Sequence, residues 1–234
     1  AVGESNGDRA IRPLELLANP TVGLSAHAGQ TDVRITAKAD TEAEALALIA
    51  PVEAEIRKAL GVAVYGVDGQ SVAEVVGRLL EDRGMALGVL DTVTDGQLAV
   101  ELQTAGHGGR VARDLHPHTL SELSKLEELN MGKSEIPTVP DKGGRLALAL
   151  ATKVTPPGGI GLAVVGPFSE ETIAIAVAGP GDLRLVRTTR FSRREAEYRR
   201  RWVIIQGLDW IRRALLGQLE SPVDWKPQPD AVRG

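Results

Sequence analysis

Two hydroxyls and two carboxylates stand together near the middle of this 234-residue chain, in the polar stretch at residues 91–96. Threonine hydroxyls can act as nucleophiles, and a nearby carboxylate can work as an acid or a base. The stretch directly follows a short apolar run at residues 86–90. Open α/β sheets bind ligands in the turn after such a strand, because backbone N–H groups and a helix N-terminus meet there. We predict a site here, with Thr92 as the candidate nucleophile and Asp91 beside it.

A hydroxyl nucleophile needs a base, and the nearest candidate by type is His118, since neutral imidazole is a competent base near pH 7. A second interpretation is a metal site, because His-x-His spacing occurs at metal centres and a carboxylate could complete it. Its ligands would be His107, His116 and His118 with Asp91 or Asp95. A third interpretation is structural, since acids at a helix start favour the helix dipole and cap free amides. The sequence leaves all three open.

The elements around residues 91–96 can be predicted from local signals. Ser71 and Glu74 have capping-box spacing, and Gly84 suits the left-handed residue that ends a helix. The run at 86–90 is typical of a strand buried on both faces of a sheet, and an amphipathic helix follows the polar turn. Farther along the chain we expect four strands, at residues 111–113, 160–166, 172–178 and 183–190. We expect helices at 119–129 and 145–154, a surface loop at 130–144, and a last helix capped by Ser192.

The front of the chain predicts a separate small unit. Residues 19–25 and 32–39 indicate two strands of an antiparallel hairpin. Thr41 and Glu44 form a second capping box, which opens a helix whose inner face carries Leu46, Ile49, Val52, Ile56 and Leu60. Pro51 should kink this helix or divide it. A third strand is expected at residues 62–66.

Composition excludes several classes of function. The chain has no cysteine, which excludes disulfides, thiolate catalysis and cysteine-bound zinc. No signal-peptide pattern opens the sequence, and no apolar run approaches the roughly 20 residues that span a bilayer, so we expect a soluble cytoplasmic protein without a membrane partner. Residues 1–70 hold 6 basic and 10 acidic residues. Such an acidic segment matches a nucleic-acid backbone poorly, and we expect no nucleic-acid partner.

The stretch 90–96 also resembles the C-terminal domain of the CinA (competence/damage-inducible) family, whose active members are nicotinamide mononucleotide deamidases. There the strand runs into Ala-Glu-Ser-Cys-Thr-Gly-Gly, and the serine is the supposed nucleophile. The matching residues here are Leu90, Asp91, Thr92, Val93, Thr94, Asp95 and Gly96. Thr92 therefore replaces the serine, and the added methyl restricts its side chain.

The resemblance continues beyond this stretch. Residues 19–22 and 34–37 match the family's KH-like middle domain, and residues 2–5 look like the exit from its N-terminal molybdopterin-binding-like domain. We therefore expect the chain to be a fragment or short form without that domain. The family's Gly-Gly-Val-Val-Ala-Tyr stretch aligns with Gly108, Gly109 and Arg113, so the activating tyrosine is replaced by arginine, and the activating lysine falls near His118. A glycine-rich loop that would hold the substrate phosphate is shortened after Gly166.

These matches predict a three-layer α/β/α sandwich at residues 71–217, preceded by a KH-like α+β domain at 1–70 and followed by a disordered tail at 218–234. The implied substrate-binding residues are Thr94, Gly96, Gly108, Gly109, Arg113 and Gly166. Because most catalytic residues differ, we expect a non-catalytic structural or regulatory domain that forms homodimers. The alternative is a nicotinamide mononucleotide deamidase that uses Thr92. We expect no cofactor and no metal; a pyridine nucleotide is the implied ligand.

Overall fold

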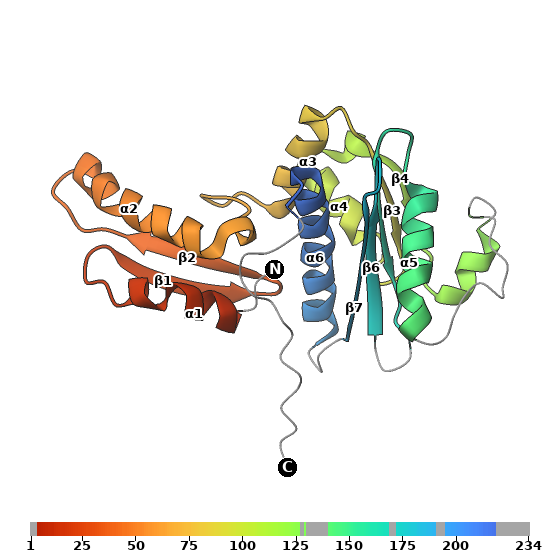
Figure 1. Ribbon diagram of the computed structural model, residues 1–234, viewed down its shortest axis with the longest axis horizontal. Coiled ribbons are helices and arrows are strands. Elements are labelled where there is room, and N and C mark those ends of the chain that lie inside the picture. Colours follow the sequence, from red (N-terminus) through yellow and green to blue (C-terminus); the bar gives the residue numbers. More distant parts are fainter. Residues whose placement is uncertain (1–3, 127–128, 130–139, 169–171, 191–194, 219–234) are drawn as a thin grey trace, which may run out of the picture. The chain divides into compact units, whose positions relative to one another are not determined.

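The computed structural model describes residues 4–126, 129, 140–168, 172–190 and 195–218 (Figure 1). Its described residues divide into two compact units, one ending at Tyr65 and the other running from Gly66 to Gly217. Each unit has its own buried core, and the candidate site lies entirely in the second. No helix in the described part of the chain combines the length and apolar character that a membrane crossing requires.

The first unit packs two helices with a two-stranded antiparallel sheet. The strands are β1 (Thr21–His27) and β2 (Gln30–Thr36), and their register runs from Thr21 opposite Thr36 to His27 opposite Gln30. Helices α1 (Glu4–Glu15) and α2 (Glu42–Leu60) complete the unit, and a short 3₁₀ turn, η1 (Gly61–Ala63), follows α2. The predicted hairpin is confirmed. Its core contains Ile11, Val22, Val52, Ile56 and Leu60.

Three expectations for this unit need correction. The strand predicted at 62–66 is wrong, because the chain forms the η1 turn there. Of the two outcomes expected at Pro51, division is wrong, because α2 continues as one helix with the proline inside it; a kink stays a prediction. Leu46, expected on the inner face of that helix, is 56% exposed, so the apolar face is buried only in the second half of the helix. The Thr41–Glu44 capping box is present as predicted.

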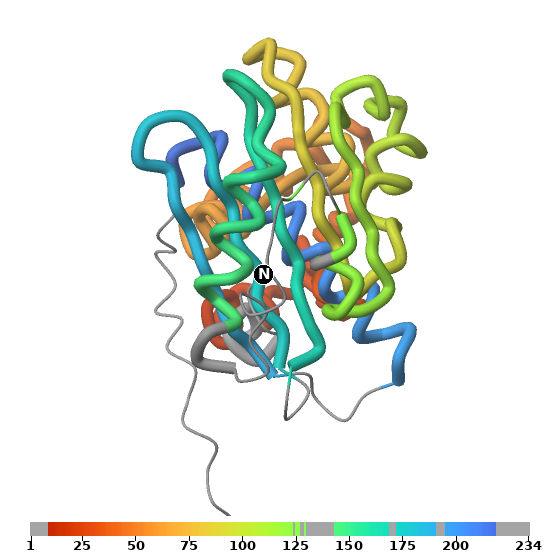
Figure 2. The backbone as a smooth tube through the Cα atoms, turned by 90° about the vertical axis from the view of Figure 1, so that its right-hand side faces the viewer, coloured from red at the N-terminus to blue at the C-terminus, as the bar shows by residue number. Residues whose placement is uncertain are grey.

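The second unit is built on a five-stranded mixed sheet in the order β4-β3-β5-β6-β7. Its strands are β3 (Leu87–Asp91), β4 (Val111–Leu115), β5 (Ile160–Val165), β6 (Thr172–Ala178) and β7 (Arg184–Arg190). Strand β3 is parallel to both β4 and β5, whereas β6 and β7 continue the sheet in antiparallel pairing. Figure 2 shows these segments side by side. All five predicted strands of this unit are present.

Helices cover both faces of this sheet, which gives three layers (Figure 1). Helix α5 (Pro140–Val154) covers one face, and α3 (Val72–Asp82), α4 (Gln97–Thr104) and α6 (Ala196–Leu216) pack on the other. Strands β3, β5 and β6 are buried along their whole length. The predicted α/β class is confirmed, and it suits a core composed of alanine, valine, leucine and isoleucine.

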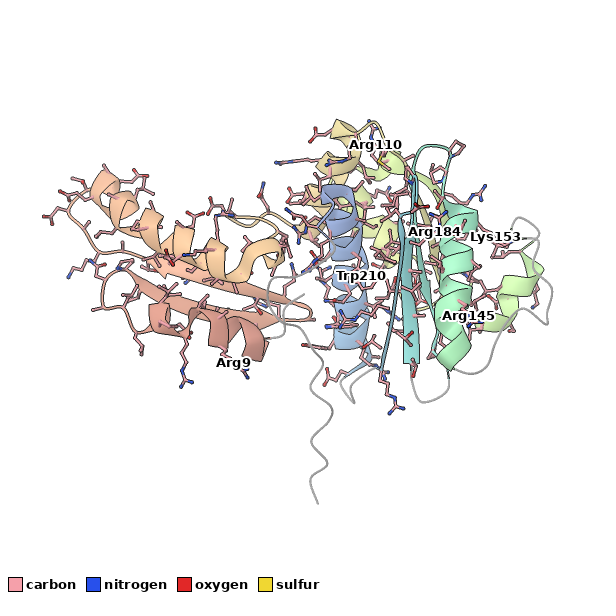
Figure 3. The ribbon with its side chains drawn as sticks, in the orientation of Figure 1. Arg9, Arg110, Arg145, Lys153, Arg184 and Trp210 are labelled. Carbon is pink, nitrogen blue, oxygen red and sulfur yellow. The ribbon has the colours of Figure 1, made fainter. Side chains whose placement is uncertain are left out.

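Two glycines let α5 lie directly against the sheet. A Cβ atom added to Gly88 of β3 would lie 1.9 Å from the carbonyl oxygen of Val154, and one added to Gly161 of β5 would lie 2.1 Å from that of Ala151. No side chain fits at such distances. Lys153, labelled in Figure 3, lies at the same end of the helix. Its ammonium donates to the Leu129 carbonyl at 2.5 Å.

Local boundaries differ from the prediction in three places of the second unit. The helix predicted at 119–129 is a 3₁₀ turn, η3 (Leu120–Lys125). Helix α5 begins at Pro140, inside the segment that was expected to be a loop, and residues 130–139 of that segment lie outside the described residues. Helix α6 has Glu195 at its N-cap; the predicted cap Ser192 is also outside the described residues, as is nearly all of the predicted tail.

Candidate functional site

The candidate site lies at the edge of the sheet where the three parallel strands end. Because β3 is parallel to β4 and β5, the loops after Asp91, Leu115 and Val165 leave the sheet at the same edge. The Thr92 N–H donates to the Val164 carbonyl at 2.9 Å, which extends the pairing of β3 with β5 by one residue. This edge is where α/β sheets bind ligands, as the sequence predicts.

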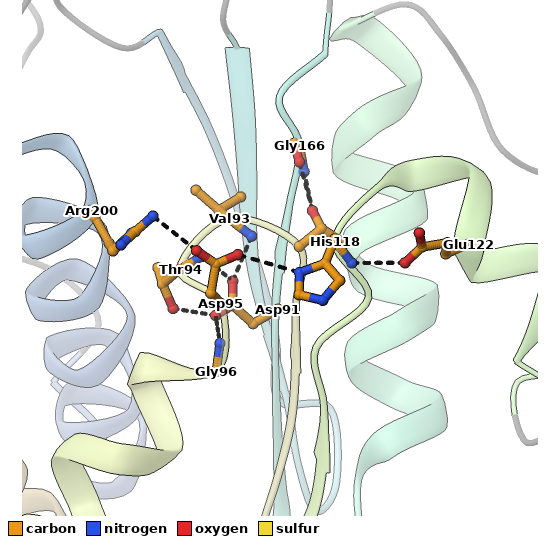
Figure 4. A network of polar contacts seen from close by, with 10 residues as sticks. Asp91, Val93, Thr94, Asp95, Gly96, His118, Glu122, Gly166 and Arg200 are labelled. Atoms are coloured by element: carbon orange, nitrogen blue, oxygen red, sulfur yellow. Dashed lines mark hydrogen bonds and ion pairs between the residues drawn. The ribbon is translucent and has the colours of Figure 1, made fainter. Parts of the chain in front are cut away.

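Asp91 is fully buried and its carboxylate holds its own loop. One oxygen, Oδ1, accepts from the backbone N–H groups of Val93 at 2.8 Å and Thr94 at 2.9 Å. The other, Oδ2, accepts from the Thr94 hydroxyl and from the Gly96 N–H at 3.3 Å. A carboxylate offers about four acceptor positions, and four donors from its own loop are bound here. Asp91 therefore determines the shape of the loop (Figure 4).

Thr92 is 6% exposed, and its hydroxyl joins the ends of two strands. It donates to the Gly166 carbonyl at 2.6 Å and accepts from the Gly166 N–H at 2.9 Å. Both backbone groups of Gly166 are thus bonded to a single side chain. A backbone carbonyl cannot remove a proton, so this hydrogen bond orients the Thr92 hydroxyl without activating it.

Asp95 follows at the rim of the site and is paired with two side chains from other elements. Its carboxylate accepts from the Arg200 guanidinium of α6 at 2.8 Å, and its other oxygen lies 3.6 Å from Nδ1 of His118. The backbone N–H of His118 donates to Glu122 at 2.9 Å. The described contacts therefore pair His118 with Asp95 and Thr92 with Gly166, and no hydrogen bond joins Thr92 to His118 among them.

A second acid and histidine lie beside this group, at the end of β4. His116 Nδ1 is 3.6 Å from an Asp114 carboxylate oxygen, and a Cβ atom added to Gly96 would lie 3.3 Å from the His116 ring. Burial raises the pKa of Asp114 above its ordinary value of 3.8, and His116 opposes this shift. Gly96 has φ of +79°, so its left-handed conformation and the nearby ring both favour glycine.

Several residues predicted from the sequence lie elsewhere. Gly108 and Gly109 belong to the turn η2 (Gly108–Arg110), which precedes β4, and Val111 pairs with Leu87 at the beginning of β3. They therefore lie at the opposite edge of the sheet from Thr92. Arg113 is in the middle of β4, and its guanidinium donates to the Lys153 carbonyl at 3.2 Å.

His107 also lies at the far edge, which separates it from the other two histidines of the metal hypothesis. Its Nδ1 is 2.9 Å from a Glu81 carboxylate oxygen, and its ring occupies the space that a side chain at Gly77 of α3 would need. Within the described residues, no group of three or more His, Cys, Asp or Glu side chains is arranged to hold a metal ion.

Comparison with known proteins shows the family of this chain. The model of the "Damage-inducible protein CinA KH domain" matches residues 1–66. A CinA-like protein of Synechococcus elongatus is 33% identical over 232 residues, which cover 93% of this chain and 51% of the relative. A putative competence-damage inducible protein of Clostridium kluyveri is 34% identical over 239 residues, covering 92% and 55%. This chain belongs to the CinA family.

Solved structures of CinA-type proteins agree with the fold of the larger unit. A CinA superfamily protein from Enterobacter cloacae superposes with a TM-score of 0.51 and 16% identity, covering 65% of this chain and 96% of that one. The competence/damage inducible protein CihA from Agrobacterium tumefaciens gives the same score and identity, covering 64% and 99%. The chain spans about half the length of the curated CinA relatives it matches.

Proposed function

We propose that this chain is a CinA-type protein whose deamidase-like unit no longer hydrolyses an amide and serves a structural or regulatory role. The observation that supports this most directly is the pair of hydrogen bonds between the Thr92 hydroxyl and the backbone of Gly166. A catalytic hydroxyl must pass its proton to a base as it attacks, whereas this proton is directed at a carbonyl oxygen.

The surroundings of Thr92 support the same proposal. The Asp91 carboxylate is occupied by four donors of its own loop, and the His118 ring is paired with Asp95. Asp91 would have to give up hydrogen bonds before it could accept a proton from Thr92, and the hydroxyl of Thr92 is bonded to Gly166 and not to His118. The side-chain oxygens of Asp91 and Thr92 are therefore bonded to the protein itself, which supports a role without hydrolysis.

The proposal extends to ligand, partners and location. A pyridine nucleotide remains the ligand we expect, bound without turnover at the carboxyl ends of β3 and β5. A regulatory role would operate through a homodimer and within a longer protein that carries a molybdopterin-binding-like domain, in the cytoplasm. Each of these statements follows from the family resemblance.

The alternative is that the chain converts nicotinamide mononucleotide and water to nicotinic acid mononucleotide and ammonia. The position of Thr92 favours it, because the hydroxyl stands at the carboxyl end of a buried central strand, and His118 follows the neighbouring strand. In this case substrate binding would have to break the hydrogen bond from the Thr92 hydroxyl to the Gly166 carbonyl and turn the hydroxyl proton toward a base.

Ammonia release from nicotinamide mononucleotide by the purified chain tests the proposal. We expect the wild type to release no more ammonia than Thr92→Val, a variant that removes the hydroxyl at nearly constant volume. Circular dichroism checks that both proteins are folded. The control is Thr92→Ser, which keeps the hydroxyl. Turnover by the wild type and Thr92→Ser that is lost in Thr92→Val would make Thr92 a nucleophile and overturn the proposal.

A further inference from the structure

Asp95 has an unusual backbone conformation for a residue that carries a side chain. Its φ of +55° lies in the left-handed region, where glycine is favoured and aspartate is tolerated at some cost. Hydrogen bonds from Val93, Thr94 and Gly96 to the buried Asp91 fix the loop on both sides of it. The loop therefore holds the Asp95 carboxylate in a defined direction.

Two side chains that can carry positive charge converge on this carboxylate from different elements (Figure 4). Arg200 comes from α6 and reaches it at 2.8 Å, and His118 comes from the segment after β4 and lies at 3.6 Å. Their side chains are 47% and 72% exposed, and that of Asp95 is 50% exposed, so the group is open to solvent. Solvent ions can reach the same position.

Neighbouring contacts fix the backbone at or beside both residues. The backbone of His118 is held by Glu122, and the next residue of α6 after Arg200, Arg201, is paired with Glu101 of α4. Removing the Asp95 carboxylate would thus leave the backbone that carries Arg200 and His118 in place, with both side chains near the vacated position. A guanidinium binds carboxylate and phosphate oxygens with the same geometry, so an external oxyanion could take the place of the carboxylate.

We propose that Asp95 is an internal counter-ion that occupies an oxyanion-binding position formed by Arg200 and His118 and thereby closes it to small anions such as phosphate. The proposal goes beyond the non-hydrolytic role proposed above, because it concerns anion binding at the rim and not chemistry at Thr92. Ammonia release and anion binding are separate measurements, so one proposal can fail without the other.

Calorimetric titration of the purified chain with inorganic phosphate, at constant ionic strength, tests whether Asp95 closes this position to anions. Asp95→Asn removes the charge, and asparagine tolerates the left-handed conformation. The ion pair of Asp95 with Arg200 is exposed, and exposed pairs contribute little free energy, so the carboxylate competes only modestly with an external anion. We therefore expect the apparent Kd for phosphate to be about two- to sixfold lower in Asp95→Asn than in the wild type. Adding Arg200→Gln to this variant should abolish the gain.

The matched control is Asp182→Asn, which removes one exposed carboxylate from the β6–β7 connection. This connection is at the other edge of the sheet, because Ala178 at the end of β6 pairs with Gly161 near the start of β5. We expect no change in its Kd. Equal phosphate affinity of Asp95→Asn and the wild type, or an equal gain in Asp182→Asn, would overturn the proposal. Asp95→Gly, which suits the left-handed backbone, replaces Asp95→Asn if that variant does not fold.

Discussion

Asp91 and Thr92 show that the partners of a side chain, more than its type, determine what it can do at a binding edge. Both residues have chemistry suited to catalysis, and both lie where an α/β sheet binds ligands. Yet Asp91 accepts four hydrogen bonds from its own loop, and Thr92 exchanges two with Gly166. Each polar atom that stabilises the loop in this way is withdrawn from reaction with a ligand.

Replacing Thr92 by valine should destabilise the protein even though its volume hardly changes. The Gly166 N–H and carbonyl would lose their common partner at a buried position, and an unsatisfied buried polar group costs about 1–3 kcal/mol. Thr92→Ser keeps both hydrogen bonds and should cost less than Thr92→Val. Urea unfolding of the three proteins measures this difference. Equal stability of the valine and serine variants would mean that the two hydrogen bonds contribute nothing.

The pairing of Asp95 with Arg200 could not be predicted from the sequence. The two are 105 positions apart, and no local spacing relates them. The types and order of residues 91–96 led to the prediction of a site at this turn, but they carry no information on this pair. The hydrogen bonds of Thr92 and Asp95 to other segments depend on how the loops and α6 meet, which only the folded structure determines.

Elements with specific local signals could be predicted, whereas short or ambiguous apolar patterns could not. The capping boxes at Thr41 and Ser71 are present because each involves residues only three positions apart. The apolar run at 62–66 has strand-like composition, but a run this short is ambiguous between strand and other structure, and it forms a 3₁₀ turn instead. The leucines at 120, 123 and 126 have a spacing of three, which fits the observed 3₁₀ turn better than an α-helix.

Packing of α5 against the sheet should depend on the glycine at position 161. A methyl group there would lie 2.1 Å from the Ala151 carbonyl oxygen, so α5 or β5 must move. Overpacking of this kind typically costs about 1–3 kcal/mol, and we expect Gly161→Ala to lower stability by at least that amount. Gly109→Ala is the control, since no atom lies within 4 Å of its added methyl. Similar unfolding midpoints for the two variants would contradict this close packing.

At the scale of the whole molecule, sheet topology decides which predicted residues can work together. The order of residues along the chain places Gly108 and Gly109 between Thr92 and His118, which suggests a common site. Because β4 is parallel to β3, the segment that enters β4 must begin at the edge opposite Thr92. The glycines at 108 and 109 and His107 therefore stay at that edge, while His116 and His118, which follow β4, reach the edge of Thr92.

The two cores should respond separately to mutation, because they share no residues. Ile56→Ala removes side-chain volume from the core of the first unit, and Leu150→Ala does so between α5 and the sheet of the second. Each buried truncation should cost about 2–5 kcal/mol. In hydrogen exchange on the full chain, we expect Ile56→Ala to reduce protection in β1 and β2 and Leu150→Ala in β3 and β5. Loss of protection in β3 and β5 on Ile56→Ala, equal to that in β1 and β2, would show that the two units unfold as one.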